Sequence, residues 1–381
     1  MTDQQSSRPE AARYADATRV VHAGLPDPTP GEPFLPGPVF AAPYHLDPAG
    51  HDPAADGYGR AGNPTVRRLE AAIGELEGGE VVAFATGMAA VTALLLSRLR
   101  PGDTVLLPSD GYFEIRRFAR EVLSPRGITV RTTPTAGPYG DLSGVRLVLL
   151  ETPANPRLDV CDIAALADAA HAAGALLAVD NTTATPLGQQ PLALGADLVV
   201  ASGTKALTGH SDVLLGYAAG ARGELVDGMR DWRSMTGAGP GPFEAWLAHR
   251  SMATLELRLA RQEANAAAVV RLLESRPEVA GLRWPGRPED PAYPLAARQL
   301  RRFPGIVTFE LASARRASAF LATSSLVAAA TSFGGVHTSA DRRAQWGDDV
   351  SPGLLRLSLG CEDPADLVAD LTVALDAAVR D

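Results

Sequence analysis

DLVVASGTKALTGHSDV, residues 197–213, joins a short apolar run to Lys205, the only lysine in a 381-residue sequence whose other 34 basic residues are arginines. Arginine serves where only positive charge is needed, but its pKa above about 12 keeps it protonated, whereas lysine can become a neutral amine that bonds to a carbonyl carbon. The alternative is a chance survivor at a tolerant surface site, but Gly203, Thr204 and Gly209 are unlike a charged surface helix. The pattern therefore predicts a nucleophilic amine at Lys205.

Short apolar runs rich in β-branched residues alternate with helical segments around this stretch. The expected strands are residues 81–84, 103–108, 128–133, 147–152, 176–182 and 197–203, and the expected helices are residues 63–76, 88–99 and 162–174. Such alternation is typical of an α/β fold with a mostly parallel, doubly wound sheet that is buried on both faces. In these sheets, ligands bind at the carboxyl ends of the strands.

The sequence divides into three parts of different character. Residues 1–62 are rich in proline and predict an extended N-terminal arm that contacts a neighbouring subunit. Residues 63–242 hold the expected large sheet, and residues 243–381 are expected to form a smaller C-terminal α/β domain. Its predicted elements are a long helical segment at 243–275, strands at 306–311, 325–333 and 354–359, and a final helix from Asp363.

Composition excludes several classes of function. The net charge of −9 argues against a nucleic-acid-binding protein, and local pairs such as Arg342 and Arg343 are interpreted as solvated surface. Cys161 and Cys361 lack metal-ligand spacing, so no metal site and no disulfide framework is expected. The polar N-terminus lacks the apolar core of a signal peptide, and the uncharged run at 81–97 divides better into a strand and a helix than into a membrane span. A cytoplasmic location is expected.

Polar residues fall where the predicted strands end. Asp180 and Glu151 each close an apolar run, and Gly87 and Met88 open a helix whose N-terminus would suit a phosphate. Pyridoxal phosphate needs an amine for its aldehyde, a carboxylate for its ring nitrogen and an anion site for its phosphate. Lys205, Asp180 and the Gly87 turn could supply all three, although each alone could be structural. No glycine-rich nucleotide-binding motif is present.

Seven motifs together carry a family resemblance. They are YGRAGNPT (58–65), FATGMAA (84–90), ETPANP (151–156), VDNTTATP (179–186), SGTKALTGHSDVLLG (202–216), FEAWLAHRSMATLELR (243–258) and LRLSLGCED (355–363). Their order from about Thr18 to the C-terminus resembles the trans-sulfuration family of pyridoxal-phosphate-dependent enzymes in cysteine and methionine metabolism. The resemblance implies the fold type I architecture of aspartate-aminotransferase-like enzymes, with residues 63–242 as the cofactor-binding domain.

The same resemblance implies how the cofactor would be held. Lys205 would bond to its aldehyde and act as catalytic base, Asp180 would pair with its ring nitrogen, and Tyr112 would stack on the ring and act as a further acid or base. Asn155 would contact the hydroxyl side of the ring. The implied phosphate ligands are Gly87, Met88, Ser202 and Thr204, joined by Tyr58 and Arg60 of the partner subunit in a homotetramer.

The resemblance also implies a substrate site, in which the chain departs from the family pattern. Arg356, with Ser332 and Asn155, would bind the substrate α-carboxylate. Glu114 stands where methionine γ-lyases carry cysteine, which argues against that branch. Two further residues are expected near the distal end of the substrate: Arg117, alternatively a surface charge, and His337, which replaces a family glutamate. SADRRAQWGDDVSPG (339–353) replaces the family's usual loop.

The implied activity is a carbon–sulfur lyase reaction on a small amino-acid substrate. We expect γ-elimination of cystathionine to cysteine, 2-oxobutanoate and ammonia. The alternatives are a cystathionine γ-synthase reaction on an activated homoserine ester, methionine γ-lyase, cystathionine β-lyase or aminotransferase activity, and a non-enzymatic pyridoxal-binding protein. The sequence leaves the exact substrate open.

Overall fold

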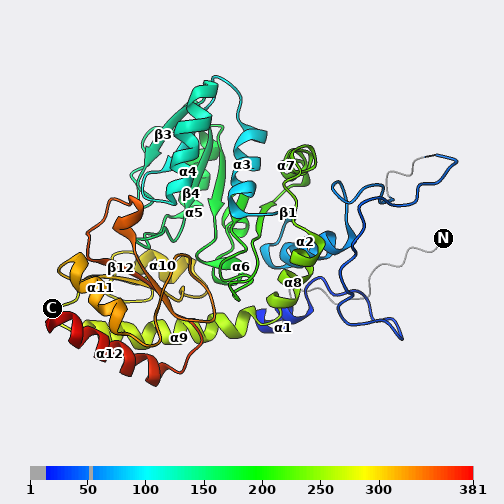
Figure 1. Ribbon diagram of the computed structural model, residues 1–381. Helices are drawn as coiled ribbons and strands as arrows, with labels where there is room; N and C mark the ends of the chain where they lie inside the picture. Colours follow the sequence, from blue (N-terminus) through cyan, green and yellow to red (C-terminus); the bar gives the residue numbers. More distant parts are fainter. Residues whose placement is uncertain (1–13, 51–54, 381) are drawn as a thin grey trace.

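Two β-sheets form the core of the computed structural model, which describes residues 14–50 and 55–380 (Figure 1). The seven-stranded sheet has the order β1-β7-β6-β5-β4-β2-β3, with β1 Glu80–Phe84, β2 Thr104–Pro108, β3 Thr129–Thr133, β4 Val145–Glu151, β5 Leu176–Asp180, β6 Leu198–Ala201 and β7 Gly216–Gly220. The five-stranded sheet has the order β10-β11-β12-β9-β8, with β8 Ala280–Arg283, β9 Ile306–Glu310, β10 Ala328–Ala329, β11 Ser339–Arg342 and β12 Leu354–Ser358.

Helices cover the sheets and link them. They are α1 Asp16–His22, α2 Pro64–Glu77, α3 Gly87–Arg98, α4 Phe113–Phe118, α5 Ile163–Ala172, α6 Thr185–Gly188, α7 Gly223–Thr236, α8 Pro242–Met252, α9 Leu255–Glu274, α10 Tyr293–Gln299, α11 Ala314–Thr323 and α12 Pro364–Arg380. Figure 1 shows α9 running from α8 beneath the smaller sheet to α12. None of the helices within residues 14–50 and 55–380 combines the length and apolar character that a membrane crossing requires.

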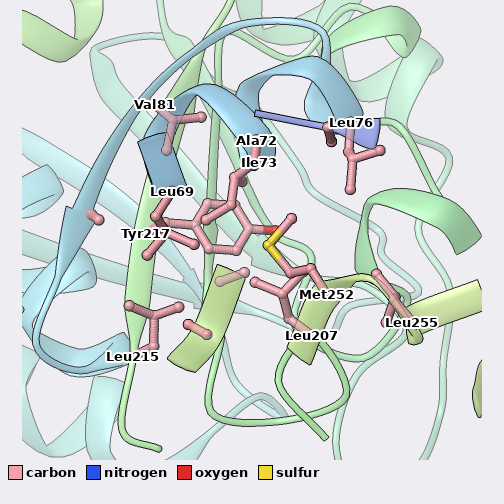
Figure 2. Close-up of a cluster of buried hydrophobic side chains, with 14 of the residues drawn as sticks. Leu69, Ala72, Ile73, Leu76, Val81, Leu207, Leu215, Tyr217, Met252 and Leu255 are labelled. Carbon is pink, nitrogen blue, oxygen red and sulfur yellow. The ribbon is translucent and has the colours of Figure 1, made fainter. Parts of the chain in front are cut away.

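The large sheet confirms the predicted α/β fold. Strands β2 to β6 pair in parallel, and only β7 runs antiparallel to its neighbours β1 and β6. Alternate residues of one strand enter cores on opposite faces: Val81 packs in the cluster drawn in Figure 2, and Val82 packs in another. Burial of both faces explains why these strands are continuous apolar runs rather than alternating ones.

The helical segment expected at 243–275 is two helices. The break falls between α8 and α9, where Met252 is the last residue of α8 and Thr254, with φ −103° and ψ 6°, is the N-cap of α9. Arg258 stabilises the break, because its guanidinium donates to the carbonyl oxygen of Ser251 at 3.1 Å and to the hydroxyl of Thr254 at 3.1 Å. Further bonds from Arg258 to the carbonyls of Ala206 and Leu207 tie this corner to the segment that follows Lys205.

The smaller sheet differs from expectation in two strands. The strand expected at 325–333 shrinks to the two residues of β10, because Ser332 and Gly334 adopt positive φ values of 77° and 81° that turn the chain. Strand β11 lies instead in the 339–353 segment, where no strand was expected. In the N-terminal arm, α1 is a helix where extended chain was expected, and Figure 1 shows the described part that follows it, residues 24–50 and 55–62, projecting away from the sheets.

A buried carboxyl in the large-sheet core should make stability depend on pH. Glu77 is 1% exposed and accepts a 2.5 Å hydrogen bond from the Tyr217 hydroxyl, and burial raises its pKa from 4.5 to about 7. The folded protein therefore holds a proton that the unfolded chain releases over this range, so Glu77 makes stability fall as pH rises from 4.5 to 7. Glu77→Gln keeps an acceptor for Tyr217 and removes this titration.

We expect the melting temperature of Glu77→Gln minus that of the unmodified protein to be larger at about pH 8 than at about pH 5. Thermal unfolding at the two pH values measures the difference. A difference between the two proteins that does not change with pH would contradict this assignment.

Candidate active site

A cavity of about 500 Å³ lies where β4, β5 and β6 end and the smaller sheet approaches the large one. Residues of both sheets line it. It brings together the predicted site residues Lys205, Tyr112, Asp180, Gly87, Met88, Ser202, Thr204, Asn155, Arg356 and Ser332. The carboxyl-end position agrees with the general rule for ligand sites in parallel sheets.

Lys205 presents its amine to this cavity. Its Nζ donates to the Ser332 Oγ at 2.7 Å and lies 5.4 Å from the centre of the Phe333 ring. Burial, followed by the positive charges of Arg356 and Arg343, lowers the pKa of Lys205 to about 8, while Asp180 opposes the shift. The amine is therefore far closer to its nucleophilic form near neutral pH than an exposed lysine would be.

Two carboxylates lie side by side at the strand ends. Asp180 and Glu151 are register partners in β5 and β4. The Oδ1 of Asp180 accepts from the backbone N–H of Thr182 at 3.0 Å and from its hydroxyl at 2.5 Å, and Oδ2 has no hydrogen-bond partner among the described residues. Burial raises the pKa of Asp180, while the Thr182 bonds and then Lys205 oppose that rise. Asp180 can therefore offer one oxygen to a protonated ring nitrogen.

Glu151 is held by backbone groups rather than aimed at a substrate. Its two oxygens accept from the N–H of Tyr112 at 2.7 Å and from the N–H of Asn155 at 2.9 Å. Burial, and then the neighbouring Asp180 carboxylate, raise the pKa of Glu151 to about 8. Its contacts position two other cavity residues.

The start of α3 forms a cup for an anion. The Thr86 side chain accepts from the N–H of Ala89 at 3.1 Å, and the first N–H groups of the helix have no partner within it. A Cβ at Gly87 would come within 2.7 Å of the Ser202 Cβ, so glycine is what lets the helix begin against β6. Gly87, Met88 and Ser202 thus surround a site that suits a phosphate.

Thr204 is less free than the other predicted phosphate ligands. Its hydroxyl donates to the carbonyl oxygen of Leu215 at 3.1 Å and accepts from the Leu215 N–H at 2.9 Å. Its proton is therefore engaged within the chain, although the residue lines the cavity.

Arg356 forms a preorganised clamp on the opposite side. Its Nη1 donates to Asn155 Oδ1 at 2.7 Å and its Nη2 to the Ser332 carbonyl at 2.7 Å. Ser332 therefore contacts the clamp through its backbone and the Lys205 amine through its hydroxyl. Burial, and then Arg343, lower the pKa of Arg356 to about 10, which leaves the side chain charged at neutral pH.

Tyr112 lies at the cavity rim with 36% of its surface exposed. It precedes α4, and its ring packs edge-on against Phe113 with 5.1 Å between centres. Burial, and then Glu114, raise the pKa of its hydroxyl. The hydroxyl is therefore neutral at physiological pH and can donate a proton.

Five predicted site residues lie outside the cavity of this single chain: Tyr58, Arg60, Glu114, Arg117 and His337. The Arg60 guanidinium donates to the Ser234 carbonyl oxygen and lies over the ring of Tyr58 in the same chain. Arg117 is exposed and forms surface ion pairs with Glu114 and Glu121, the surface-charge alternative considered above. His337 is exposed, because the chain turns away from the cavity after Gly334.

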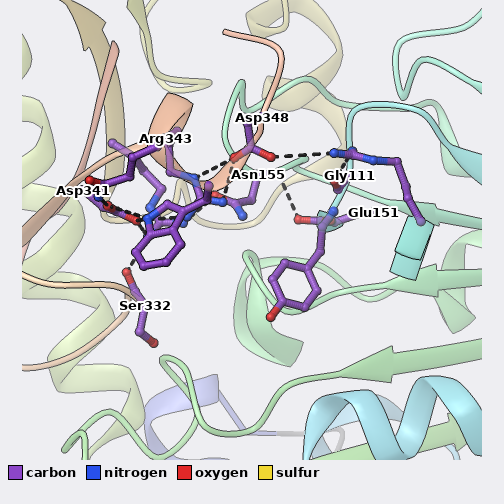
Figure 3. A network of polar contacts seen from close by, with 12 residues as sticks. Gly111, Glu151, Asn155, Ser332, Asp341, Arg343 and Asp348 are labelled. Atoms are coloured by element: carbon purple, nitrogen blue, oxygen red, sulfur yellow. Dashed lines mark hydrogen bonds and ion pairs between the residues drawn. The ribbon is translucent and has the colours of Figure 1, made fainter. Parts of the chain in front are cut away.

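Sequence reasoning missed a buried charged group at the cavity. Arg343 had been interpreted as solvated surface, yet its side chain is 6% exposed and lies between Asp341 and Asp348, at 3.0 Å and 2.7 Å (Figure 3). Asp348 also approaches Arg116 of α4 at 3.7 Å, and Trp346 lines the cavity beside Arg343. The one available signal was that the other four residues belong to the 339–353 segment, which departs from the family pattern. They are Asp341, Arg343, Trp346 and Asp348.

These features define a class of enzyme. An α/β sheet whose carboxyl ends present a lysine amine, a carboxylate with a free oxygen and a helix N-terminus fits pyridoxal phosphate. No group of three or more His, Cys, Asp or Glu side chains in the described part of the chain is placed to hold a metal ion.

Comparison with known proteins agrees. The chain belongs to the family described as Cys/Met metabolism PLP-dependent enzyme, whose model matches residues 44–376. It is therefore a pyridoxal-phosphate-dependent enzyme with the fold type I architecture that the sequence predicted.

Individual relatives span both γ-lyases and γ-synthases. A Streptomyces coelicolor protein named "Putative cystathionine gamma-lyase" is 55% identical over 376 residues, which cover 96% of this chain and 95% of that protein. The cystathionine gamma-synthase of Mycobacterium tuberculosis is 40% identical, with 94% and 96% covered. The solved cystathionine gamma synthase of Xanthomonas oryzae pv. oryzae in complex with cystathionine superposes with a TM-score of 0.91 at 35% identity, covering 96% and 98% of the two chains.

The lowered pKa of Lys205 makes a prediction about cofactor uptake. Only the neutral amine attacks an aldehyde, and its fraction grows as pH rises toward the pKa of about 8. We expect the rate at which apoenzyme regains bound pyridoxal phosphate to rise about tenfold between pH 7 and pH 9 and then level off. Stopped-flow absorbance measures that rate. A rate still climbing through pH 10 would show an amine with an ordinary lysine pKa.

Proposed function

We propose that this chain is a lyase that eliminates the γ-substituent of a sulfur amino acid, with cystathionine as substrate and cysteine, 2-oxobutanoate and ammonia as products. One observation carries the proposal: Ser332 contacts the Lys205 amine and the Arg356 clamp at 2.7 Å each. An amino acid held by its carboxylate on Arg356 therefore presents its Cα hydrogen to Lys205.

Asp180, the α3 N-terminus and Lys205 have separate roles in the proposed reaction. Bound pyridoxal phosphate supplies an electron-withdrawing ring that makes the Cα proton of the substrate acidic. Asp180 would keep a proton on the ring nitrogen through Oδ2, which has no hydrogen-bond partner among the described residues, and the α3 N-terminus would hold the phosphate. Lys205 would hold the cofactor aldehyde and, as a free amine, would take the Cα proton of the substrate as general base; a Cβ proton must also leave so that its bonding electrons can replace the departing γ-sulfur.

Tyr112 is the second proton-handling group in this proposal. Its hydroxyl is neutral because burial raises its pKa, so it can donate a proton to the departing γ-sulfur. The Glu151 carboxylate accepts from the Tyr112 backbone N–H and thereby fixes the point at which the ring enters the cavity.

Arg356 binds the α-carboxylate. A guanidinium suits this task because its N–H groups lie in one plane and can bond both carboxylate oxygens. Asn155 and Ser332 accept hydrogen bonds from the guanidinium and hold it in one orientation, so little side-chain entropy is lost when a substrate binds.

We also propose that the enzyme is a homotetramer in which Tyr58 and Arg60 of the partner subunit complete the phosphate site. Leu214 lines the cavity and is 64% exposed, so the cavity is open on this side in one chain. Phe34 of the arm is 92% exposed and Phe40 is 72% exposed, as expected of an arm that packs on another subunit. Light scattering measures whether the protein is a tetramer. Arg60→Ala should retain pyridoxal phosphate less tightly than the unmodified protein.

We propose that the chain has three parts: the arm at 1–62, the cofactor-binding domain at 63–242 and the C-terminal domain at 243–381. A cytoplasmic location is proposed because Cys161 and Cys361 are both free thiols, which suit a reducing compartment.

Product identification tests the function directly. Purified holoenzyme incubated with cystathionine should release 2-oxobutanoate and cysteine, identified by mass. Absence of both would refute the proposal. Cystathionine formed from cysteine and an activated homoserine ester would favour γ-synthase activity, in line with the mycobacterial relative. Amino transfer to an added 2-oxo acid without elimination would show an aminotransferase.

A further inference from the structure

Trp346 lies between the catalytic cavity and a second cavity of about 410 Å³. Trp346 and Thr331 line both cavities. We call the second cavity the outer cleft; besides these two residues it is lined by residues of α11 and of the chain around β10 and β11, among them Leu321, Ala330, Arg342 and Gln345. A side chain in this position controls whether the catalytic cavity continues into the outer cleft.

The indole is anchored, although 44% of Trp346 is exposed. Its Nε1 donates to the Asp341 carboxylate, 3.0 Å from each oxygen, and Asp341 also accepts from Arg343 Nη1 at 3.0 Å. Arg343 and Trp346 are the first and last residues of the 3₁₀ turn η5 (Arg343–Trp346), in which side chains three residues apart eclipse each other. The turn therefore directs both side chains at the same buried carboxylate, and a charged acceptor makes these bonds strong.

The same carboxylate relates Trp346 to the substrate clamp. Asp341 in β11 is the register partner of Arg356 in β12, and their side chains approach to 3.8 Å. Because one aspartate anchors both residues, the distance from the α-carboxylate site to the indole is fixed by the smaller sheet. That distance is the length available to the rest of a bound amino acid.

We propose that Trp346 is the specificity-determining residue that limits the length of the γ-substituent, acting as the wall that separates the catalytic cavity from the outer cleft. The proposal rests on the function proposed above and names its substrate class: α-amino acids whose γ-substituent is no longer than that of cystathionine and ends against the indole. Removing the indole opens the catalytic cavity into the outer cleft, where Leu321, Ala329 and Ala330 offer apolar surface to a longer chain.

A ladder of unreactive ligands tests this without requiring turnover. 2-Aminobutyrate, norleucine, 2-aminooctanoate and 2-aminodecanoate carry the α-carboxylate but no leaving group, and the last has a longer side chain than cystathionine; their binding to holoenzyme is followed by cofactor absorbance. In the unmodified enzyme, affinity should rise with length and then fall once the chain meets Trp346. In Trp346→Ala, affinity should continue to rise, roughly fourfold for each added methylene group.

Two further variants make the test specific. Trp346→Phe keeps an aromatic ring at the boundary and should keep the length limit of the unmodified enzyme. Gln345→Ala removes another hydrogen bond to Asp341, of 2.9 Å, and lines only the outer cleft, so its length limit should also be unchanged. An unchanged limit in Trp346→Ala, or an equal change in Gln345→Ala, would overturn the proposal.

Failure of this inference is distinguishable from failure of the proposed function. The ligand ladder reports binding whether or not any substrate is cleaved. If no thioether releases a 2-oxo acid, the proposed lyase activity is refuted. Binding of the unreactive ligands still shows whether Trp346 limits the length of the side chain.

Discussion

Lys205→Arg should abolish covalent attachment of the cofactor and lower turnover by at least about 10⁴-fold. Arginine preserves the positive charge but has no amine that can lose its proton, so both the bond to the cofactor aldehyde and the base for the Cα proton are lost. Release of 2-oxobutanoate measures turnover. Borohydride reduction followed by mass spectrometry measures attachment, and the unmodified protein should gain one phosphopyridoxyl group, the cofactor mass less one oxygen atom, on its single lysine.

Ser332→Ala is the matched control for this prediction. It removes the hydroxyl that accepts from Lys205 Nζ at 2.7 Å but leaves the amine in place, so reduction should still attach the cofactor. Equal melting temperatures of the two apo variants would exclude a general loss of fold. A cofactor adduct that persists in Lys205→Arg would refute the role assigned to the lysine.

Arg356→Lys should lower kcat/KM by about 10²-fold, mainly through a higher KM, since losing a charge-assisted bidentate contact costs about 3 kcal/mol. Lysine keeps the charge but cannot donate to Asn155, Ser332 and both carboxylate oxygens from one plane. Initial rates over a range of cystathionine concentrations separate KM from kcat.

Arg117→Lys provides the corresponding control. Arg117 is exposed and paired with surface glutamates, so its replacement should leave both kinetic constants unchanged. A fall in kcat with unchanged KM in Arg356→Lys would mean that the arginine acts in the transition state rather than in holding the substrate.

Local sequence was sufficient to predict the parallel strands of the large sheet and to place Asp180 and Lys205 at the ends of two of them. The apolar runs that became β4, β5 and β6 are buried on both faces, so they are continuous and easily recognised. Asp180 and Lys205 follow such runs directly, and strand ends of a parallel sheet meet at one edge. Their roles remain predictions that the mutations above test.

The substrate side could not be predicted in the same way, because it is assembled by long-range contacts. Arg343 resembles an exposed charge until β11 pairs with β12 and places Asp341 and Asp348 around it. Strand β7 was also missed, since GYAAG (216–220) is glycine-rich and becomes a strand only by pairing on both sides with β1 and β6. The break between α8 and α9 likewise depends on the reach of Arg258.

The exposure of His337 shows the limit of transferring a role by position in a motif. The family pattern placed a substrate-contacting residue after SFGGV, but the turn at Ser332 and Gly334 leads the chain away from the cavity before His337. Trp346, nine residues later, lies at the cavity instead. We therefore propose that substrate selection in this chain depends on the segment that carries Trp346.

The partly buried Lys205 has a practical consequence for labelling. Because the sequence contains no second lysine, an amine-reactive reagent can modify only this side chain and the chain's N-terminal amine. A small reagent that enters the cavity would tag the catalytic position without any engineering, and bound cofactor or substrate would protect it. The rate of tagging thus becomes a direct gauge of how often the cavity is empty. Conversely, a lysine-to-lysine crosslinker could join the side chains of two copies only between their Lys205 residues, so the proposed assembly is better mapped through carboxylates or arginines.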